Sequence, residues 1–150
     1  MKIVDYRPEL QCYFERFNKA WLEENNWLEP IDTFVLENPE ESILRSGGKI
    51  FFAEHEGKII GAVALRYLNK TTIELTKMAV DKAARGLGAG TVLCQAGIDA
   101  ARQMGVPTLV LYSQSLLIHA LAIYRKLGFV EVPIEPGVYK RADVKMKLDF

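Results

Sequence analysis

The sequence has few of the features that mark metal, disulfide-bonded and membrane proteins. Its two cysteines, Cys12 and Cys94, lie far apart and form no CxxC or Cys/His cluster, which argues against a zinc site and a disulfide framework. Free thiols are typical of a reducing compartment. No apolar run approaches the ~20 residues that cross a bilayer, and the N-terminal residues have no signal-peptide core. We therefore expect a cytoplasmic protein without a metal and without a membrane partner.

Net charge is also absent. The 19 basic and 19 acidic residues cancel, so the chain lacks the electrostatic footprint of a nucleic-acid-binding protein. Its 150 residues, of which 49% are hydrophobic and 25% charged, have the composition of an ordinary globular domain with its own core. We expect one domain over residues 1–150.

The first third of the sequence has a helical pattern. Apolar side chains recur at spacings of three and four from Leu10 to Trp21, which predicts one helix. Asn38, followed by proline and two acidic residues, is the expected N-cap of a second short helix. Gly47 and Gly48 are expected to end that helix.

From residue 50 onward the pattern is typical of a mixed α/β sheet. Three β-rich runs form an expected antiparallel meander, and strand–helix–strand–helix–strand follows with a right-handed crossover. Gly97 would allow the first of these helices to approach the sheet closely. The expected strands cover 50–54, 59–67, 72–80, 108–112, 129–132 and 141–148, and the expected helices run from the loop at 86–90 to about 104 and over 116–127.

The segment from Thr72 to Gly90 places glycines where a strand ends and a helix begins. Helix N-termini present unpaired N–H groups and a partial positive charge, and glycines let a phosphate approach those donors. Arg85 adds a cation, so the segment describes a pyrophosphate cradle. A flexible turn that permits tight packing is the simpler interpretation. A Rossmann fingerprint is excluded because Thr91 stands at its third glycine, and a P-loop is excluded because no lysine follows.

Two motifs carry a family resemblance. The first is R-x-x-G-x-G, at Arg85, Gly88 and Gly90, and the second is Tyr124-Arg-Lys-Leu-Gly-Phe129 at the end of the following helix. In this order the pair resembles the signatures of the GNAT superfamily of acetyl-CoA-dependent N-acetyltransferases, over about residues 50–132. The resemblance implies a GNAT-like mixed sheet that splays beside the Gly-rich loop.

The resemblance also implies a site for acetyl-CoA. In this family the strand before the loop pairs with the pantetheine arm, as an added peptide strand would, and loop N–H groups bind the pyrophosphate. Many relatives place an asparagine against the pantetheine; Gln114 stands near that place, and its amide offers the same donor and acceptor. The other residues that this assigns to the cofactor are Met78, Ala79, Val80, Arg85, Gly86, Leu87, Gly88, Ala89, Gly90 and Thr91.

Acetyl transfer to an amine requires a base and an acid. An alkylammonium has a pKa of ~10.4, so a base is useful near neutral pH. Glu74 is the one carboxylate between Ile73 and Val80, and some family members carry a glutamate here; it is either the general base, a solvent-facing residue or an ion-pair partner of Lys77. Tyr124 matches the family tyrosine that protonates the departing thiolate, and its alternative role is a core tyrosine.

The acceptor is expected to be the primary amine of a small molecule, selected by the N-terminal helices and by residues 133–140. An acidic and aromatic neighbourhood could attract a cationic amine, although a solvated helix end with core tryptophans is the simpler interpretation; its members are Trp21, Glu23, Glu24, Trp27, Glu29 and Asp32. His119 is expected to be structural. Relatives commonly dimerise, so a homodimer stays open. A non-catalytic acyl-CoA-binding sensor and an enzyme for longer acyl groups are the rival functions.

Overall fold

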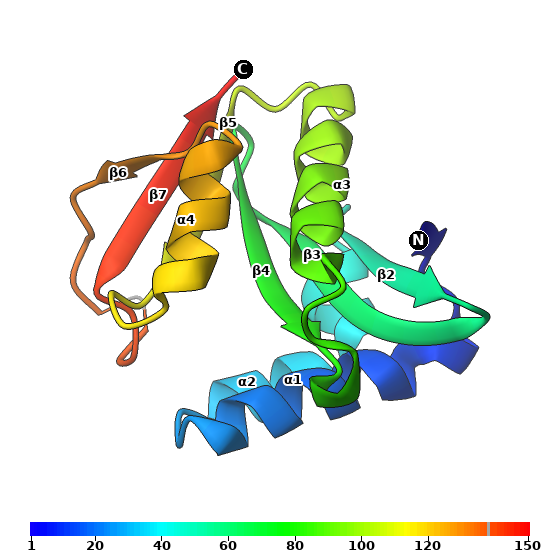
Figure 1. The fold of residues 1–150 in the computed structure, drawn as a ribbon. Helices are drawn as coiled ribbons and strands as arrows, with labels where there is room; N and C mark the ends of the chain where they lie inside the picture. The colour runs from blue at the N-terminus through cyan, green and yellow to red at the C-terminus, as the bar shows by residue number, and fades with distance from the viewer. Residues whose placement is uncertain (138) are drawn as a thin grey trace.

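A mixed sheet organises the computed structural model, which describes residues 1–137 and 139–150 (Figure 1). The strands are β1 (Lys2–Asp5), β2 (Lys49–His55), β3 (Lys58–Asn69), β4 (Thr72–Val80), β5 (Thr108–Ser113), β6 (Val130–Val132) and β7 (Val144–Asp149). They form a seven-stranded sheet in the order β1-β2-β3-β4-β5-β7-β6. Only the β4–β5 pair is parallel, and the other neighbours are antiparallel.

Helices cover both faces of this sheet (Figure 1). On one face lie α3 (Ala89–Gln103) and α4 (Ile118–Lys126), and on the other lie α1 (Gln11–Glu24) and α2 (Pro30–Glu37). Short turns complete the described elements: the 3-10 helices η1 (Pro8–Leu10) and η3 (Lys82–Ala84) and the π-helical turn η2 (Glu40–Leu44). None of the helices in the described ranges is both long enough and apolar enough to cross a membrane.

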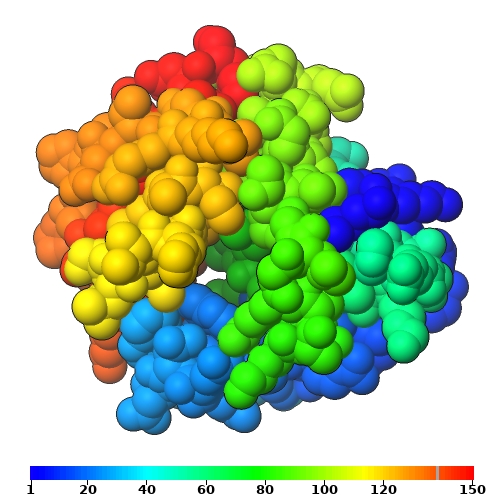
Figure 2. Space-filling model, viewed as in Figure 1, coloured from blue at the N-terminus to red at the C-terminus, as the bar shows by residue number. Residues whose placement is uncertain are grey.

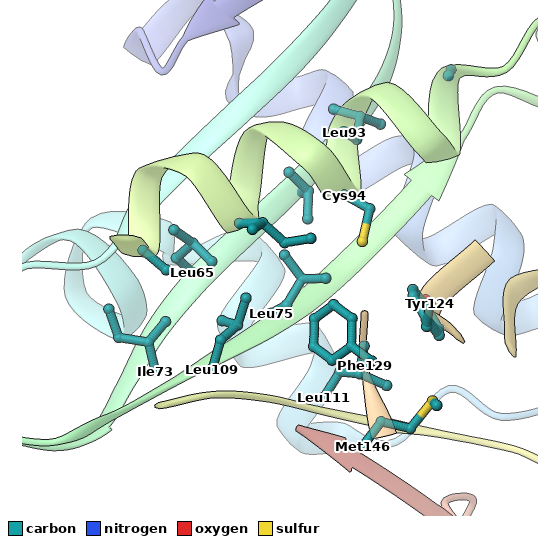
Figure 3. Packing of buried hydrophobic residues seen from close by; sticks show 14 of the residues in the cluster. Leu65, Ile73, Leu75, Leu93, Cys94, Leu109, Leu111, Tyr124, Phe129 and Met146 are labelled. Atoms are coloured by element: carbon teal, nitrogen blue, oxygen red, sulfur yellow. The ribbon is translucent and has the colours of Figure 1, made fainter. Parts of the chain in front are cut away.

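The packing of α3 against β4 follows from its small residues. A side chain at Gly97 would place Cβ 2.4 Å from Leu75 Cδ1, so the glycine lets the Leu75 side chain pack directly against the backbone of α3, in agreement with the predicted close approach. In Figure 3 the Cys94 side chain of α3 points toward Leu75 of β4 and toward Phe129, and Leu93 packs on the other side of the helix, next to Gly61 of β3. The central helix is therefore held tightly on β4, and its N-terminus is fixed beside the end of that strand.

The strand and helix pattern from residue 50 onward is confirmed, with β4 at its predicted bounds and the final strand beginning later, at Val144. The predicted second short helix is present as η2, which has two acidic residues in its first turn and ends before Gly47 and Gly48. Its predicted cap is wrong, because the N-cap is Pro39 and Asn38 is the C-cap of α2, where its side-chain amide donates to the Phe34 carbonyl at 3.0 Å. The helix α2 itself was not predicted; it starts at Pro30, where Glu29 and Asp32 form a capping box. β1 was not predicted, since four residues carry too short a pattern.

Candidate active site

The site begins where β4 and β5 separate. The two strands pair only from Thr72 to Glu74 on β4, opposite 108–110 on β5. Beyond Glu74, β4 has a register irregularity against β3, and Lys77 takes a positive φ of 53°. A bulge of this kind bends a strand and increases its twist. The second half of β4 therefore leaves one backbone edge facing a gap, in agreement with the predicted splay of the sheet.

A cavity of about 800 Å³ fills this gap. It is lined by β4, the Gly-rich turn, the end of β5, the start of α4 and the connection between α1 and α2. Figure 2 shows the molecule hollowed between the start of α3 (green), the start of α4 (yellow) and the α1–α2 region (blue). The volume of this cavity lies in the range of small-molecule and cofactor sites. Residues from both faces of the sheet therefore meet in one cavity.

The Gly-rich turn forms one end of the cavity. Gly86 and Gly88 have φ values of 91° and 84°, a backbone region that favours glycine. Gly88 is the N-cap of α3, and no side chain caps that end of the helix. The amides of the first turn, from Ala89 onward, therefore keep their capacity to bind an anion. This geometry is the one expected of a pyrophosphate cradle.

The structure brings most of the predicted cofactor residues together. The cavity is lined by Met78, Ala79, Val80, Arg85, Gly86, Gly88, Ala89, Gly90, Thr91 and Gln114. Leu87 is exposed and is absent from the lining. Gln114 uses its Oε1 to accept a hydrogen bond from the Leu116 amide at 2.7 Å, so part of its amide is engaged by its own turn.

The Arg85 side chain forms an ion pair beside the Gly-rich turn. Its guanidinium donates two hydrogen bonds, of 3.2 and 2.9 Å, to the Glu24 carboxylate at the end of α1. Both side chains are about 40% exposed. The predicted cation is thus present at the cradle, and it also links the cradle to the helix on the opposite face of the sheet.

Tyr124 lies on α4, at the boundary of core and cavity. It is 9% exposed, packs edge-on against Phe129 and lines the cavity. Burial raises the pKa of its phenol well above the ordinary value. Tyr124 therefore belongs to the core, as the simpler interpretation holds, and still reaches the cavity as a protonated phenol.

Glu74 is held at the point where the strands part. It is 1% exposed and lines the cavity. Arg66 donates to its Oε1 at 2.8 Å, and the Tyr139 hydroxyl donates to its Oε2 at 2.9 Å. The solvent-facing alternative is therefore wrong, and the predicted pairing with Lys77 is replaced by one with Arg66, because Arg66 is its cross-strand neighbour on β3.

A buried charge cluster next to Glu74 was not predicted. Asp32, at 0% exposure, accepts a 2.7 Å bond from Lys77 Nζ and bonds of 2.9 and 3.0 Å from Arg141. Arg141 also donates to Glu29 at 3.0 Å. We call these four residues the Asp32 cluster. It joins α2, β4 and the segment before β7, which are far apart in sequence; the capping box at Glu29 and Asp32 was the only local signal.

The charges of the Asp32 cluster set its electrostatics. Burial would raise the pKa of Asp32, but Lys77 and Arg141 outweigh it and hold that pKa below the ordinary value. Burial, reinforced by the neighbouring Arg141, lowers the pKa of Lys77. The carboxylate of Asp32 is therefore ionised at neutral pH. Of its two cationic partners, Lys77 and Arg141, Arg141 is the one that stays protonated at any physiological pH.

Aromatic rings complete the second end of the cavity. Trp21 and Trp27 line it and meet edge to face with centroids 5.6 Å apart. Tyr139 belongs to the predicted selecting segment 133–140, of which residue 138 lies outside the described residues. Its ring lies 4.9 Å from the Arg141 guanidinium carbon and 5.7 Å from Lys77 Nζ.

The acidic neighbourhood predicted from the sequence is largely neutralised. Glu24 is paired with Arg85, while Glu29 and Asp32 belong to the Asp32 cluster. Glu23 is exposed. His119 is exposed at the start of α4 and also lines the cavity. Within the described residues no group of three or more His, Cys, Asp or Glu side chains is placed to hold a metal ion.

The fold and the site together define a class of protein. The mixed sheet opens between a bulged strand and its parallel neighbour, and a glycine-capped helix begins at the opening. This is the arrangement that the resemblance of the two motifs to GNAT signatures implies. The acetyltransferase (GNAT) family model matches residues 6–129. The chain therefore belongs to the GNAT acetyltransferase family.

Curated relatives and solved structures agree with this assignment. A mycothiol acetyltransferase of Saccharomonospora viridis is 30% identical over 131 residues, which cover 87% of this chain and 40% of that protein. A second mycothiol acetyltransferase, from Thermomonospora curvata, is 33% identical over 57% of this chain and 29% of its own length. The chain thus spans less than half of these relatives.

Structural similarity extends over the whole chain. A GNAT-family acetyltransferase from Staphylococcus aureus Mu50 superposes with a TM-score of 0.84 at 23% identity, over 99% of this chain and 98% of that one. The yncA protein from Salmonella typhimurium, whose structure contains acetyl-CoA, gives a TM-score of 0.81 at 18% identity, over 99% of this chain and 92% of that one. At these identities the likeness shows the fold.

Proposed function

We propose that residues 1–150 form one N-acetyltransferase domain that transfers the acetyl group of acetyl-CoA to the primary amine of a small molecule. The observation that supports this most is the single cavity in the sheet opening, with a glycine-capped helix at one end and Glu74 among aromatic rings at the other. Acetyl-CoA bound to the yncA neighbour supports the choice of donor.

The donor binds through backbone groups in this proposal. The free edge of β4 at Met78, Ala79 and Val80 pairs with the amides of pantetheine, as a peptide strand would. The N–H groups of the Gly-rich turn bind the pyrophosphate, with Arg85 beside them. Gln114 contacts the pantetheine with the part of its amide that its own turn leaves unused. A cavity wall made of backbone donors and glycine fits a long, amide-bearing anion.

Glu74 and Tyr124 divide the proton transfers. Glu74 accepts a proton from the ammonium, directly or through water, and the neutral amine attacks the thioester carbonyl. As the C–N bond forms and the C–S bond breaks, Tyr124 gives its phenolic proton to the departing thiolate. The second proton of the attacking nitrogen restores the phenol through water, and the proton on Glu74 is released to solvent. The bonds from Arg66 and Tyr139 orient the Glu74 carboxylate. Free coenzyme A and an N-acetylated amine are the products.

The proposal is tested by measuring release of free thiol from acetyl-CoA across a panel of small amines. We expect turnover that depends on the amine, and about a hundredfold loss of kcat at pH 7 in Glu74→Gln, within the usual range for a general base. Glu131→Gln, an exposed carboxylate on β6, is the control. Tight binding of acetyl-CoA with no turnover for any amine would support the sensor instead.

A further inference from the structure

The charges around the acceptor end of the cavity are arranged in two layers. Asp32 and Glu29 lie behind the wall and are absent from the cavity lining, whereas Lys77 and Arg141 both line it. Asp32 accepts hydrogen bonds from both cations, and Glu29 accepts one from Arg141. The cavity therefore meets the cationic side of the Asp32 cluster, which is the reverse of the acidic neighbourhood that the sequence indicates.

The guanidinium of Arg141 has donors to spare. It carries five N–H groups, of which Nη1 uses two, on Glu29 and Asp32, and Nη2 uses one, on Asp32. Among residues 1–137 and 139–150, no group accepts from Nε or from the second Nη2 hydrogen. Those two donors lie on one edge and match the two oxygens of a carboxylate.

Arg141 lines the cavity, and its surroundings in the described part of the chain leave the Nε–Nη2 edge as the one open to a ligand. The Tyr139 ring covers one face of the guanidinium at 4.9 Å, and Asp32 holds its far edge. Only 16% of the side chain is exposed, so a ligand bound there is largely removed from water. Hydrogen bonds between ionised partners are about twice as strong as neutral ones, and screening by water is reduced in such a site.

Tyr139 also connects this donor edge with the proposed base. Its hydroxyl donates to Glu74 at 2.9 Å, while its ring contacts the Arg141 guanidinium. The length of one tyrosine side chain therefore separates the group that would bind a carboxylate from the group that would deprotonate an amine. One small molecule can reach both groups.

Resting on the function proposed above, we infer that the acceptor is an amine that also carries a carboxylate, as an amino acid does. Arg141 binds the carboxylate through its Nε–Nη2 edge, and the amine lies toward Glu74. The side chain of the acceptor packs against Trp21 and Trp27. Arg141 is then the specificity-determining residue of the acceptor site, and the Asp32 cluster is the support that holds it in position.

The test compares matched ligands. Each common L-α-amino acid is paired with its amide and with its decarboxylated amine, and each is titrated calorimetrically into protein saturated with coenzyme A. Rates of thiol release are measured in parallel across pH, so that neutral-amine concentrations are matched. We expect at least one acid to bind at least tenfold more tightly than its amide and its amine, and to show the same preference in kcat/KM.

A pair of variants tests whether Arg141 causes the preference for the acid over its amide and its amine. Arg141→Lys keeps the charge beside Asp32 but removes the donor edge, so we expect the acid preference to fall at least tenfold through KM, with unchanged affinity for coenzyme A. Arg102→Lys, exposed on α3, is the control.

Equal affinity for acid, amide and amine would overturn the inference, as would no binding of any acid at millimolar concentration or an unchanged preference in Arg141→Lys. Because the calorimetric arm needs no turnover, an acid preference without thiol release would sink the proposed function and leave the carboxylate site standing.

Discussion

The two ends of the cavity are built in different ways. The donor end consists of backbone: a free strand edge, two glycines with positive φ and the first turn of α3. The acceptor end consists of side chains from α1, the α1–α2 connection, β4 and the segment before β7, and buried ion pairs with Asp32 of α2 hold it from behind. Backbone recognition suits a ligand that is the same throughout a family, whereas a side-chain cluster can change with each acceptor. Substitutions at the two ends should therefore differ in what they change: stability and chemistry at the acceptor end, and affinity for acetyl-CoA at the donor end.

The largest effect is expected at the acceptor end, in Asp32→Asn. The substitution leaves Lys77 and Arg141 buried beside a neutral amide, and breaking a buried pair in this way costs about 3–5 kcal/mol. Urea unfolding followed by circular dichroism measures the loss. Glu37→Gln, which removes a half-exposed partner of Lys19, is the control and should cost less than about 1 kcal/mol. Equal losses in the two variants would contradict the structural role of the Asp32 cluster.

The same cluster gives stability a defined pH dependence. Because the pKa of Asp32 is lower in the folded state than its ordinary value, its ionised form stabilises the fold above that ordinary value, and the contribution is lost as pH falls through the folded-state pKa. The wild-type free energy of unfolding should therefore fall more steeply below about pH 4 than that of Asp32→Asn.

Tyr124 lies between the two ends, and Tyr124→Phe separates chemistry from binding. Because burial keeps the phenol protonated, its hydroxyl is the proposed proton donor. We expect kcat to fall about a hundredfold, within the range for a general acid, while the dissociation constant of acetyl-CoA changes less than threefold. Tyr67→Phe, on β3 outside the cavity lining, is the control. Equal kcat in Tyr124→Phe and wild type would remove Tyr124 from the mechanism.

This contrast also explains what the sequence could predict. The donor end lies in one continuous stretch, so strand, glycines and helix start were recognisable from local pattern alone, and ten of the eleven predicted cofactor residues line the cavity. Arg141 and Asp32 are 109 positions apart, and no periodicity connects them. Glu74 was recognisable as an isolated carboxylate in an apolar strand, but its partner Arg66 depended on strand register, which local pattern does not determine.

A smaller effect is expected in the Gly-rich turn. Gly88→Ala places a side chain at φ 84°, where left-handed backbone costs about 1–2 kcal/mol, and it should weaken acetyl-CoA binding about tenfold by displacing the start of α3. Gly57→Ala is a matched control, because Gly57 has φ 78° and equally open surroundings but lies in the β2–β3 hairpin. Both variants should lose similar stability, and only Gly88→Ala should lose affinity. Equal affinity for acetyl-CoA in the two variants would contradict the role of the Gly-rich turn as a pyrophosphate cradle.

The smallest effect is expected where the two ends are joined, at the Glu24–Arg85 pair. Both side chains are about 40% exposed, so Glu24→Gln should leave the free energy of unfolding nearly unchanged. The variant frees the Arg85 guanidinium from its carboxylate, and we expect it to bind acetyl-CoA two- to threefold more tightly at low salt, with the gain lost at high salt because exposed charges are screened. Glu23→Gln, the exposed neighbour without this partner, should show neither change. Calorimetric titrations at two salt concentrations make the comparison. Weaker binding in Glu24→Gln would instead mean that the pair positions the cradle, and that the acceptor face of the sheet stabilises the donor end.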